Sequence, residues 1–180
     1  MDFEEKTIDS RSIYSGRIIH VKEDTVRLPD GKTAGRELVL HNGGVGVIAV
    51  DENMCVPMVR QYRKPFDEVV LEIPAGKLEK GENPYDAGLR ELCEETGYTA
   101  EKYRFIGKSY PSPGYLSEVI SLYLAEELRF VGQRPDPEEF LEIEKIPLVR
   151  LYQMVMSNEI TDAKTQIAIL KAYNILNEEK

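Results

Sequence analysis

The feature that most constrains this chain is residues 76–98, which read GKLEKGENPYDAGLRELCEETGY. Asn83 suits the N-cap of a helix and Pro84 suits its first position, while Gly97 suits the left-handed residue that ends a helix. The segment therefore predicts a helix over residues 84–96, preceded by a loop that begins at Gly76.

Carboxylates collect on one face of this predicted helix. At roughly 100° per residue, Glu91, Glu94 and Glu95 share one sector, and each pair repels by some tenths of a kcal/mol. Arg90 relieves only part of this repulsion, so a further cation is expected. Oxygen ligands without a nearby histidine or thiolate favour a hard ion, Mg²⁺ or Mn²⁺. The opposite face is mostly apolar and gathers Tyr85, Leu89, Leu92, Cys93 and Thr96.

A solvated acidic helix is the alternative interpretation, but it requires neither Gly76 nor Glu82. The segment follows the pattern G-x5-E-x7-R-E-U-x-E-E-x-G-U, where U is aliphatic, at every position except the last, Tyr98. It resembles the box of the Nudix hydrolases, which cleave nucleoside diphosphates linked to another moiety. The resemblance implies Mg²⁺-dependent diphosphate hydrolysis and an α/β/α sandwich with a mixed β-sheet.

Length and charge limit the remaining possibilities. A chain of 180 residues without repeats favours one core, and none of its apolar runs approaches the roughly 18 residues of a membrane span. The net charge of −9 argues against binding nucleic acid or a membrane surface. The acidic start lacks the apolar core of a signal peptide, so a cytoplasmic location is expected. Cys55 and Cys93 lack metal-type spacing and are expected to be reduced core residues.

The order of the expected elements is mixed. Strands over 17–28 and 33–41 flank the turn of residues 28–32 and form an N-terminal β-hairpin arm. We expect residues 1–42 to form this arm and residues 43–180 to form the Nudix hydrolase domain. Further strands are expected at 45–50, 54–63, 69–76, 103–110, 118–128 and 140–146, and a helix at about 148–157.

A last helix is expected after Thr161 or Asp162. Its apolar residues recur at helical spacing, which indicates a core-facing stripe rather than a binding surface. The residues of this stripe are Ile167, Leu170, Tyr173 and Leu176.

The family resemblance assigns roles to matching positions. It implies that the Ala75 carbonyl, Glu91 and Glu95 are metal ligands, with Glu94 sharing a metal or holding its water. Arg90 is cationic and cannot bind metal, so an ion pair that anchors the loop is its expected role. Glu82 is either its partner or a ligand of an additional metal.

A second segment bears on the substrate. Ser112-Pro113-Gly114, followed by Glu118, resembles the ADP-ribose pyrophosphatase branch of the family, in which a proline follows the box at about this offset. This resemblance implies cleavage of ADP-ribose to AMP and ribose 5-phosphate, with Glu118 contacting the terminal ribose. Another nucleoside diphosphate sugar or a dinucleotide is the alternative substrate. A catalytically silent nucleotide sensor is the alternative class, but all three box carboxylates are present.

Other charged residues are expected near the substrate. Arg36 and Arg63 could clamp phosphate or stack on adenine, with plain surface charge as the alternative. By resemblance, Glu72 could touch the nucleotide. The general base is expected on the loop before the last strand, where Glu138 is the first choice and Glu139 the second. A solvated acidic loop is the alternative there.

The branch also implies a homodimer in which the N-terminal strands reach the partner. The apolar residues Ile18, Ile19 and Val21, with 38–40, fit an arm that must be covered. Cover by the arm's own domain is the alternative.

Overall fold

The computed structural model describes residues 3–134 and 140–178, and they divide into two compact units. One unit contains the chain up to Gly43 together with the segment Tyr110–Val119. The other contains Gly44–Ser109 and the chain from Ile120 onward. The segment Tyr110–Val119 therefore belongs with the N-terminal residues rather than with its neighbours in sequence.

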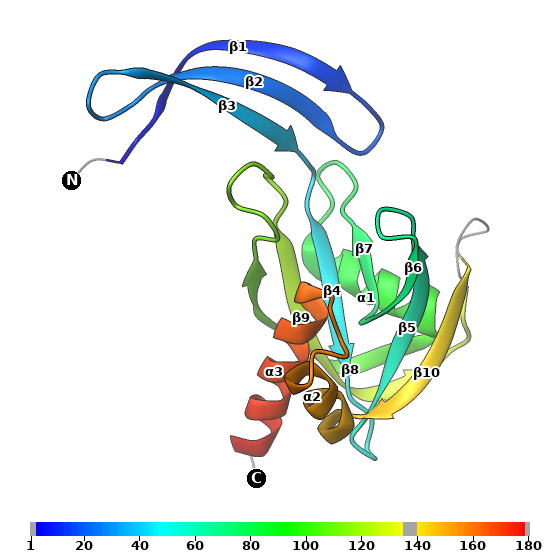
Figure 1. Ribbon diagram of the computed structural model, residues 1–180. Coiled ribbons are helices and arrows are strands. Elements are labelled where there is room, and N and C mark those ends of the chain that lie inside the picture. Colours follow the sequence, from blue (N-terminus) through cyan, green and yellow to red (C-terminus); the bar gives the residue numbers. More distant parts are fainter. Residues whose placement is uncertain (1–2, 135–139, 179–180) are drawn as a thin grey trace. The chain divides into compact units, whose positions relative to one another are not determined.

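The N-terminal unit is an antiparallel sheet in the order β1-β2-β3, with β1 at Lys6–Ser15, β2 at His20–Arg27 and β3 at Thr33–Leu40 (Figure 1). The predicted hairpin is β2–β3, whose turn closes through the Gly31 N–H donating to the Leu28 carbonyl at 2.9 Å. Strand β1 was not predicted, because every one of its residues is exposed and its sequence carries no buried alternation.

The second unit is built on a mixed sheet in the order β7-β4-β9-β8. Strands β4 and β9 run parallel, and the β4–β7 and β8–β9 pairs are antiparallel. All six residues of β4 are buried, as expected for a strand covered on both faces. The bounds are β4 Gly44–Ala49, β7 Ala75–Lys77, β8 Tyr98–Ser109 and β9 Ile120–Phe130.

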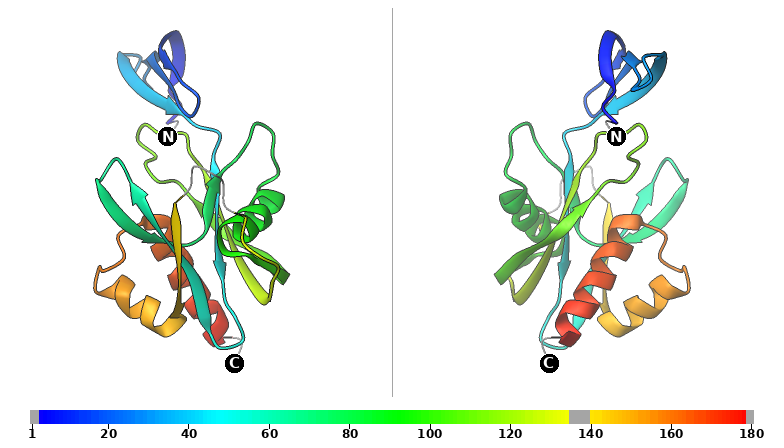
Figure 2. Two further views of the ribbon diagram at one scale, coloured as in Figure 1. Left: turned by 90° about the vertical axis from the view of Figure 1, so that its right-hand side faces the viewer. Right: turned by 90° about the vertical axis from the view of Figure 1, so that its left-hand side faces the viewer.

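Helices cover both faces of this sheet. Val47 faces α1 (Pro84–Thr96) and packs with Leu92, whereas its neighbour Ile48 faces the other side and joins the larger core with Ile169 of α3 (Ala163–Glu178). Figure 2 shows α1 on one side of the strands, and α3 with α2 (Leu148–Met156) on the other. The expected α/β/α arrangement is confirmed.

A smaller antiparallel sheet, in the order β10-β5-β6, contributes to the core on the α3 side. The predicted strand over 69–76 is in fact divided between the two sheets, because Pro74 has no N–H for a ladder and interrupts it. The Pro74 carbonyl still accepts from the Val47 N–H at 2.9 Å. The bounds are β5 Cys55–Arg63, β6 Glu68–Glu72 and β10 Leu141–Pro147.

The predicted stripe of the last helix does contact the core, since Leu176 belongs to it and Ile167 and Tyr173 pack against it, but other residues of the helix are buried more deeply. Of the predicted residues only Leu176 is buried, and the others are half-buried. The buried residues are Thr165, Ala168, Ile169, Ala172 and Leu176. Within the described ranges, no helix is both long and apolar enough to cross a membrane.

Candidate functional site

The helix that carries the carboxylates has the predicted caps. Asn83 Oδ1 accepts from the Tyr85 N–H at 3.0 Å, and Pro84 occupies the first helical position. Gly97 ends the helix at a φ of 77°, with its N–H donating to the Cys93 carbonyl at 2.9 Å. The predicted bounds of α1, residues 84–96, are confirmed.

Two carboxylates of α1 are buried against the backbone of β7. Glu91 is 9 % exposed and Glu95 is 3 % exposed, although both are ionisable. Glu95 Oε2 accepts from the Ala75 N–H at 3.0 Å. A Cβ on Gly76 would lie 1.9 Å from Glu91 Oε1, so only glycine leaves room for this carboxylate where it stands. Burying an ionised carboxylate is unfavourable unless a cation or hydrogen-bond donors offset the loss of water, so Glu91 and Glu95 are expected to have cationic partners.

Arg90 supplies part of that compensation. It contacts Glu82 at 3.1 Å, Glu91 at 2.9 Å and Glu94 at 2.8 Å. Burial alone would lower the pKa of Arg90, but the neighbouring carboxylates outweigh burial and raise it well above its ordinary value. Glu82 also accepts from the Glu79 N–H, so the predicted pairing of Arg90 with Glu82 ties the loop to the helix.

The donors at this place are the hard oxygens that divalent cations prefer. Across residues 3–134 and 140–178, no three Asp, Glu, His or Cys side chains converge on a metal position, and Arg90 bridges Glu91 and Glu94. The Ala75 N–H donates to Glu95, so the backbone of β7 lies directly beside the buried carboxylates. The carboxylate oxygens of Glu91, Glu94 and Glu95 therefore fit a hard cation by their chemistry.

A second charged cluster lies where β5, β6 and α3 meet. Arg63 donates two hydrogen bonds to the Glu72 carboxylate, from Nε at 2.5 Å and from Nη2 at 2.9 Å, and Lys164 contacts the same carboxylate. Glu72 is only 3 % exposed, and burial alone would raise its pKa, but Arg63 and Lys164 lower it below the ordinary value. Lys164 also contacts Asp162 at 3.0 Å, so the cluster holds two cations and two anions.

Sequence reasoning missed Lys164 and Asp162 because it assigned α3 to packing alone. A signal was present, since Lys164 lies in the first turn of a helix, where a cation opposes the helix dipole. Such a placement indicates a specific anionic partner, and Glu72 is that partner here.

Other predicted residues belong to the N-terminal unit. Arg36 pairs with Glu5 through two hydrogen bonds of 2.8 and 2.5 Å, and Glu118 lies 3.4 Å from Nδ1 of His41. Pro113 and Gly114 lie in the segment that joins this unit. The structure thus brings the predicted residues together within each unit separately. Glu138 and Glu139 lie outside the described residues.

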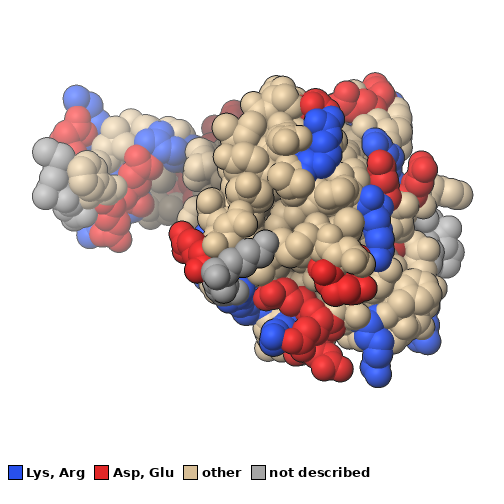
Figure 3. Space-filling model, turned by 90° about the horizontal axis from the view of Figure 1, so that it is seen from below, with Lys and Arg blue, Asp and Glu red and all other residues tan. Residues whose placement is uncertain are grey.

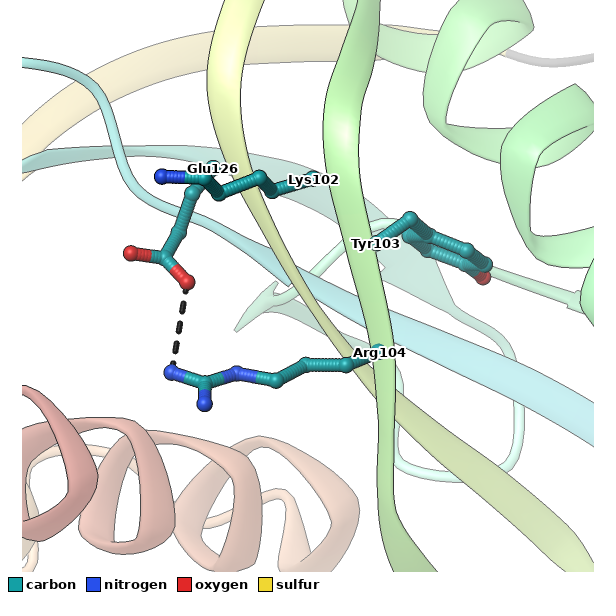
Figure 4. A pocket seen from close by; sticks show the side chains of 4 residues that line it. All are labelled: Lys102, Tyr103, Arg104 and Glu126. Atoms are coloured by element: carbon teal, nitrogen blue, oxygen red, sulfur yellow. Dashed lines mark hydrogen bonds and ion pairs between the residues drawn. The ribbon is translucent and has the colours of Figure 1, made fainter.

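The surface outside these two clusters shows no comparable group of buried charged residues among those that the structure describes. A hollow of about 430 Å³ on β8 and β9 is lined by charged groups that pair with one another, Arg104 with Glu126 at 3.3 Å, while Tyr103 points the other way (Figure 4). Lys102 pairs with Glu127 at 2.5 Å. On the face drawn in Figure 3, the Lys and Arg side chains of the described residues lie beside acidic ones, so that face carries no basic patch.

Comparison with known proteins identifies the family. Residues 40–169 match the NUDIX domain, and residues 5–39 match the nucleoside diphosphate sugar hydrolase N-terminal domain. An ADP-ribose pyrophosphatase of Bacillus subtilis is 46% identical over 92% of this chain and 91% of its own length. A methanol dehydrogenase activator of Bacillus methanolicus is 44% identical over 93% and 91%.

A crystal structure described as an ADP compounds hydrolase shares the fold, with a TM-score of 0.88 over 99% of this chain and 98% of that one, at 20% identity. The expected sandwich is therefore of the Nudix type. Together with the box carboxylates on α1, these matches show that the chain belongs to the Nudix hydrolase family.

Proposed function

We propose that this chain hydrolyses the diphosphate of ADP-ribose to AMP and ribose 5-phosphate, with Mg²⁺ as the cofactor. The observation that carries the proposal is the burial of Glu91 and Glu95 against Ala75 and Gly76 in a Nudix chain. The 46% identical relative named an ADP-ribose pyrophosphatase supports the choice of substrate.

Glu91, Glu95 and the Ala75 carbonyl are the proposed metal ligands, with Glu94 sharing a metal or holding its water. A bound Mg²⁺ or Mn²⁺ would neutralise the diphosphate and lower the pKa of the attacking water. Arg90 holds Glu91 and Glu94 in place through its two contacts from Nη1. Arg90 thus keeps these acidic side chains close together before the metal and the nucleotide bind.

The remaining roles fall to groups that bind substrate and move a proton. Arg63 and Arg36 are the proposed phosphate or adenine contacts, since guanidinium binds such groups bidentately or by stacking. In this proposal Glu72, Pro113 and Gly114 lie beside the nucleotide, and Glu118 contacts the terminal ribose. Glu138, or failing that Glu139, accepts the proton of the attacking water.

Another nucleoside diphosphate sugar or a dinucleotide is the rival substrate. The match of residues 5–39 to a nucleoside diphosphate sugar hydrolase domain favours another nucleoside diphosphate sugar. A silent nucleotide sensor is the rival class, and the intact set of box carboxylates speaks against it.

We further propose that the protein is a cytoplasmic homodimer, with residues 1–42 as the interface arm and 43–180 as the Nudix domain. Two apolar side chains of the arm, Ile13 and Ile18, are 53 % and 52 % exposed, which suits a surface that a partner covers. Light scattering at micromolar concentration should give twice the chain mass of 20.5 kDa, and a monomer would contradict the dimer.

The test of the reaction is release of AMP from ADP-ribose by the purified chain. Release should require added Mg²⁺ or Mn²⁺, and ADP-ribose should be the best substrate in a panel that includes other nucleoside diphosphate sugars and dinucleotides. Glu95→Gln should lower kcat by at least about 10²-fold, the scale on which loss of one electrostatic group is felt. Asp86→Asn, on the exposed side of the same helix, should leave kcat unchanged.

The outcomes separate the alternatives. Faster turnover of another nucleotide would make that nucleotide, rather than ADP-ribose, the assigned substrate. Absence of turnover with every nucleotide would favour the nucleotide sensor. Near-normal turnover by Glu95→Gln would contradict the metal assignment.

A further inference from the structure

The first turn of α3 reaches into the second charged cluster. Lys164 is only 12 % exposed in its side chain, and its Nζ contacts both Glu72 Oε2 and Asp162 Oδ2. Asp162 also caps the helix, since its Oδ2 accepts from the Thr165 N–H at 3.0 Å. Lys164 is therefore held at a defined place by the helix that carries it.

Glu72 lies between two cations. Arg63 approaches Oε1 through Nε and Oε2 through Nη2, and Lys164 shares Oε2. Both carboxylate oxygens are thus occupied by protein groups in a place that is almost closed to solvent. Glu72 is consequently placed to hold Arg63 rather than to bind a ligand through free oxygens.

Arg63 is the member of this cluster that faces outward. Its side chain is 37 % exposed, against 4 % for that of Glu72. Only Nε and Nη2 make hydrogen bonds to described residues, so Nη1 and its protons have no partner among them. The hydrogen bonds that Arg63 donates to Glu72 raise the pKa of Arg63, and the negative charge of Glu95 adds to the effect.

The same turn of α3 also fixes the main chain that leads to the box. Thr165 is fully buried, and its Oγ1 accepts from the Ile73 N–H at 3.0 Å. Two residues further on, the Ala75 N–H donates to Glu95. The segment from Glu72 to Ala75 is therefore held by α3 at its beginning and by α1 at its end.

We propose that Lys164 is a positioning residue for the hydrolysis: by sharing Glu72 it fixes Arg63 and leaves that guanidinium with charge for an anionic group of the nucleotide. The inference rests on the proposed function. Arg63 and Lys164 balance the charges of Glu72 and Asp162, so the cluster as a whole is neutral. Arg63 is its exposed member, so an approaching phosphate would contact the outward side of Arg63. Without Lys164, the full charge of Glu72 falls on Arg63, which weakens its attraction for a second anion and loosens its orientation.

The test compares Lys164→Met with Lys171→Met in the full chain. Lys171 lies on the same helix but donates to the Ile106 carbonyl and touches neither cluster. Lys164→Met should raise KM for ADP-ribose by about 10-fold, the lower end of effects seen when groups behind a site are removed, while kcat changes little. The Kd of a methylene-bridged ADP-ribose analogue in Mg²⁺ should rise by the same factor, and Lys171→Met should alter neither constant.

A double-mutant cycle separates positioning from general support. In an Arg63→Met background, Lys164→Met should have almost no further effect on KM, because the group through which it acts is gone. If Lys164→Met does not fold, Glu72→Gln/Lys164→Met removes both buried charges together and should still raise KM.

The inference is overturned if Lys164→Met has the KM of Lys171→Met, or if its effect multiplies fully with that of Arg63→Met. Unchanged KM in a folded Glu72→Gln/Lys164→Met variant also overturns it. Failure of the wild type to release AMP would instead overturn the proposed function, so the two failures are distinguishable.

Discussion

The two charged clusters of the second unit are built from similar residues but balance their charges differently. Around α1, the carboxylates of Glu82, Glu91 and Glu94 share the one guanidinium of Arg90. At the start of α3, Glu72 and Asp162 are matched by Arg63 and Lys164. In the first cluster three carboxylates contact one arginine, which suits an incoming cation, whereas the four residues of the second balance in charge and suit a structural or positioning role.

The difference teaches how to interpret buried carboxylates. Burial alone does not distinguish Glu72 from Glu95, since both are 3 % exposed. The arrangement of cations does, because a carboxylate with two protein cations has no need of a metal. A buried carboxylate that lies beside backbone and other carboxylates is the better metal candidate.

The largest expected effect that tests this contrast comes from Gly76→Ala. The new Cβ would lie 1.9 Å from Glu91 Oε1, and the carboxylate is the flexible end of a side chain, so it should move aside rather than disrupt the fold. We expect kcat to fall about 10²-fold, as for a misplacement of about 1 Å, with the melting temperature nearly unchanged.

Asp86→Asn is the control, because Asp86 is exposed on the same helix as Glu91. It should leave kcat unchanged. Equal activity of Gly76→Ala and the wild type would show that the position of Glu91 does not matter for turnover.

Glu72→Gln, unlike Gly76→Ala, should lower stability, in addition to the rise in KM expected when Arg63 is no longer held. It leaves Arg63 and Lys164 without their shared anion, and breaking a buried ion pair from one side costs about 3–5 kcal/mol of the free energy of unfolding. Denaturant unfolding at neutral pH measures this loss. Glu144→Gln breaks the exposed pair with Arg60 and should cost no more than about 1 kcal/mol.

The sign of the pH dependence follows from the lowered pKa of Glu72. The stabilisation is fully present above the ordinary glutamate pKa of about 4.3 and is lost as pH falls through the lower folded value. The difference between wild type and Glu72→Gln should therefore shrink below about pH 4. A difference that stays constant down to acid pH would contradict the ion-pair account.

How far the sequence could predict these clusters depends on how local they are. The caps Asn83 and Gly97 and the carboxylates of α1 lie within one segment, so both the helix and its acidic cluster were predictable. The contact between Glu72 and Lys164 joins residues 92 positions apart, and no periodicity encodes it. Strand β1 was missed for a related reason, since its residues are exposed and bury no face that a pattern could reveal.

Tyr103→Phe should have the smallest effect. Tyr103 extends the comparison because its polar group is buried without a hydrogen-bond partner among the described residues, unlike Glu72. Burial, reinforced by Tyr123 and Tyr85, raises the pKa of the Tyr103 hydroxyl well above the ordinary value. Tyr103→Phe removes the unsatisfied group and should stabilise the fold by about 1 kcal/mol.

Gly88 on α1 provides an independent test, since a Cβ there would lie 2.0 Å from the Tyr103 hydroxyl. Gly88→Ala should therefore destabilise the wild type more than it destabilises Tyr103→Phe, as measured by denaturant unfolding. Tyr62→Phe is the control, because that exposed hydroxyl donates to Asp67 at 2.8 Å and its removal should bring no gain. A loss of stability in Tyr103→Phe would mean that the hydroxyl finds a hydrogen-bond partner in solution, and its burial would then not be uncompensated.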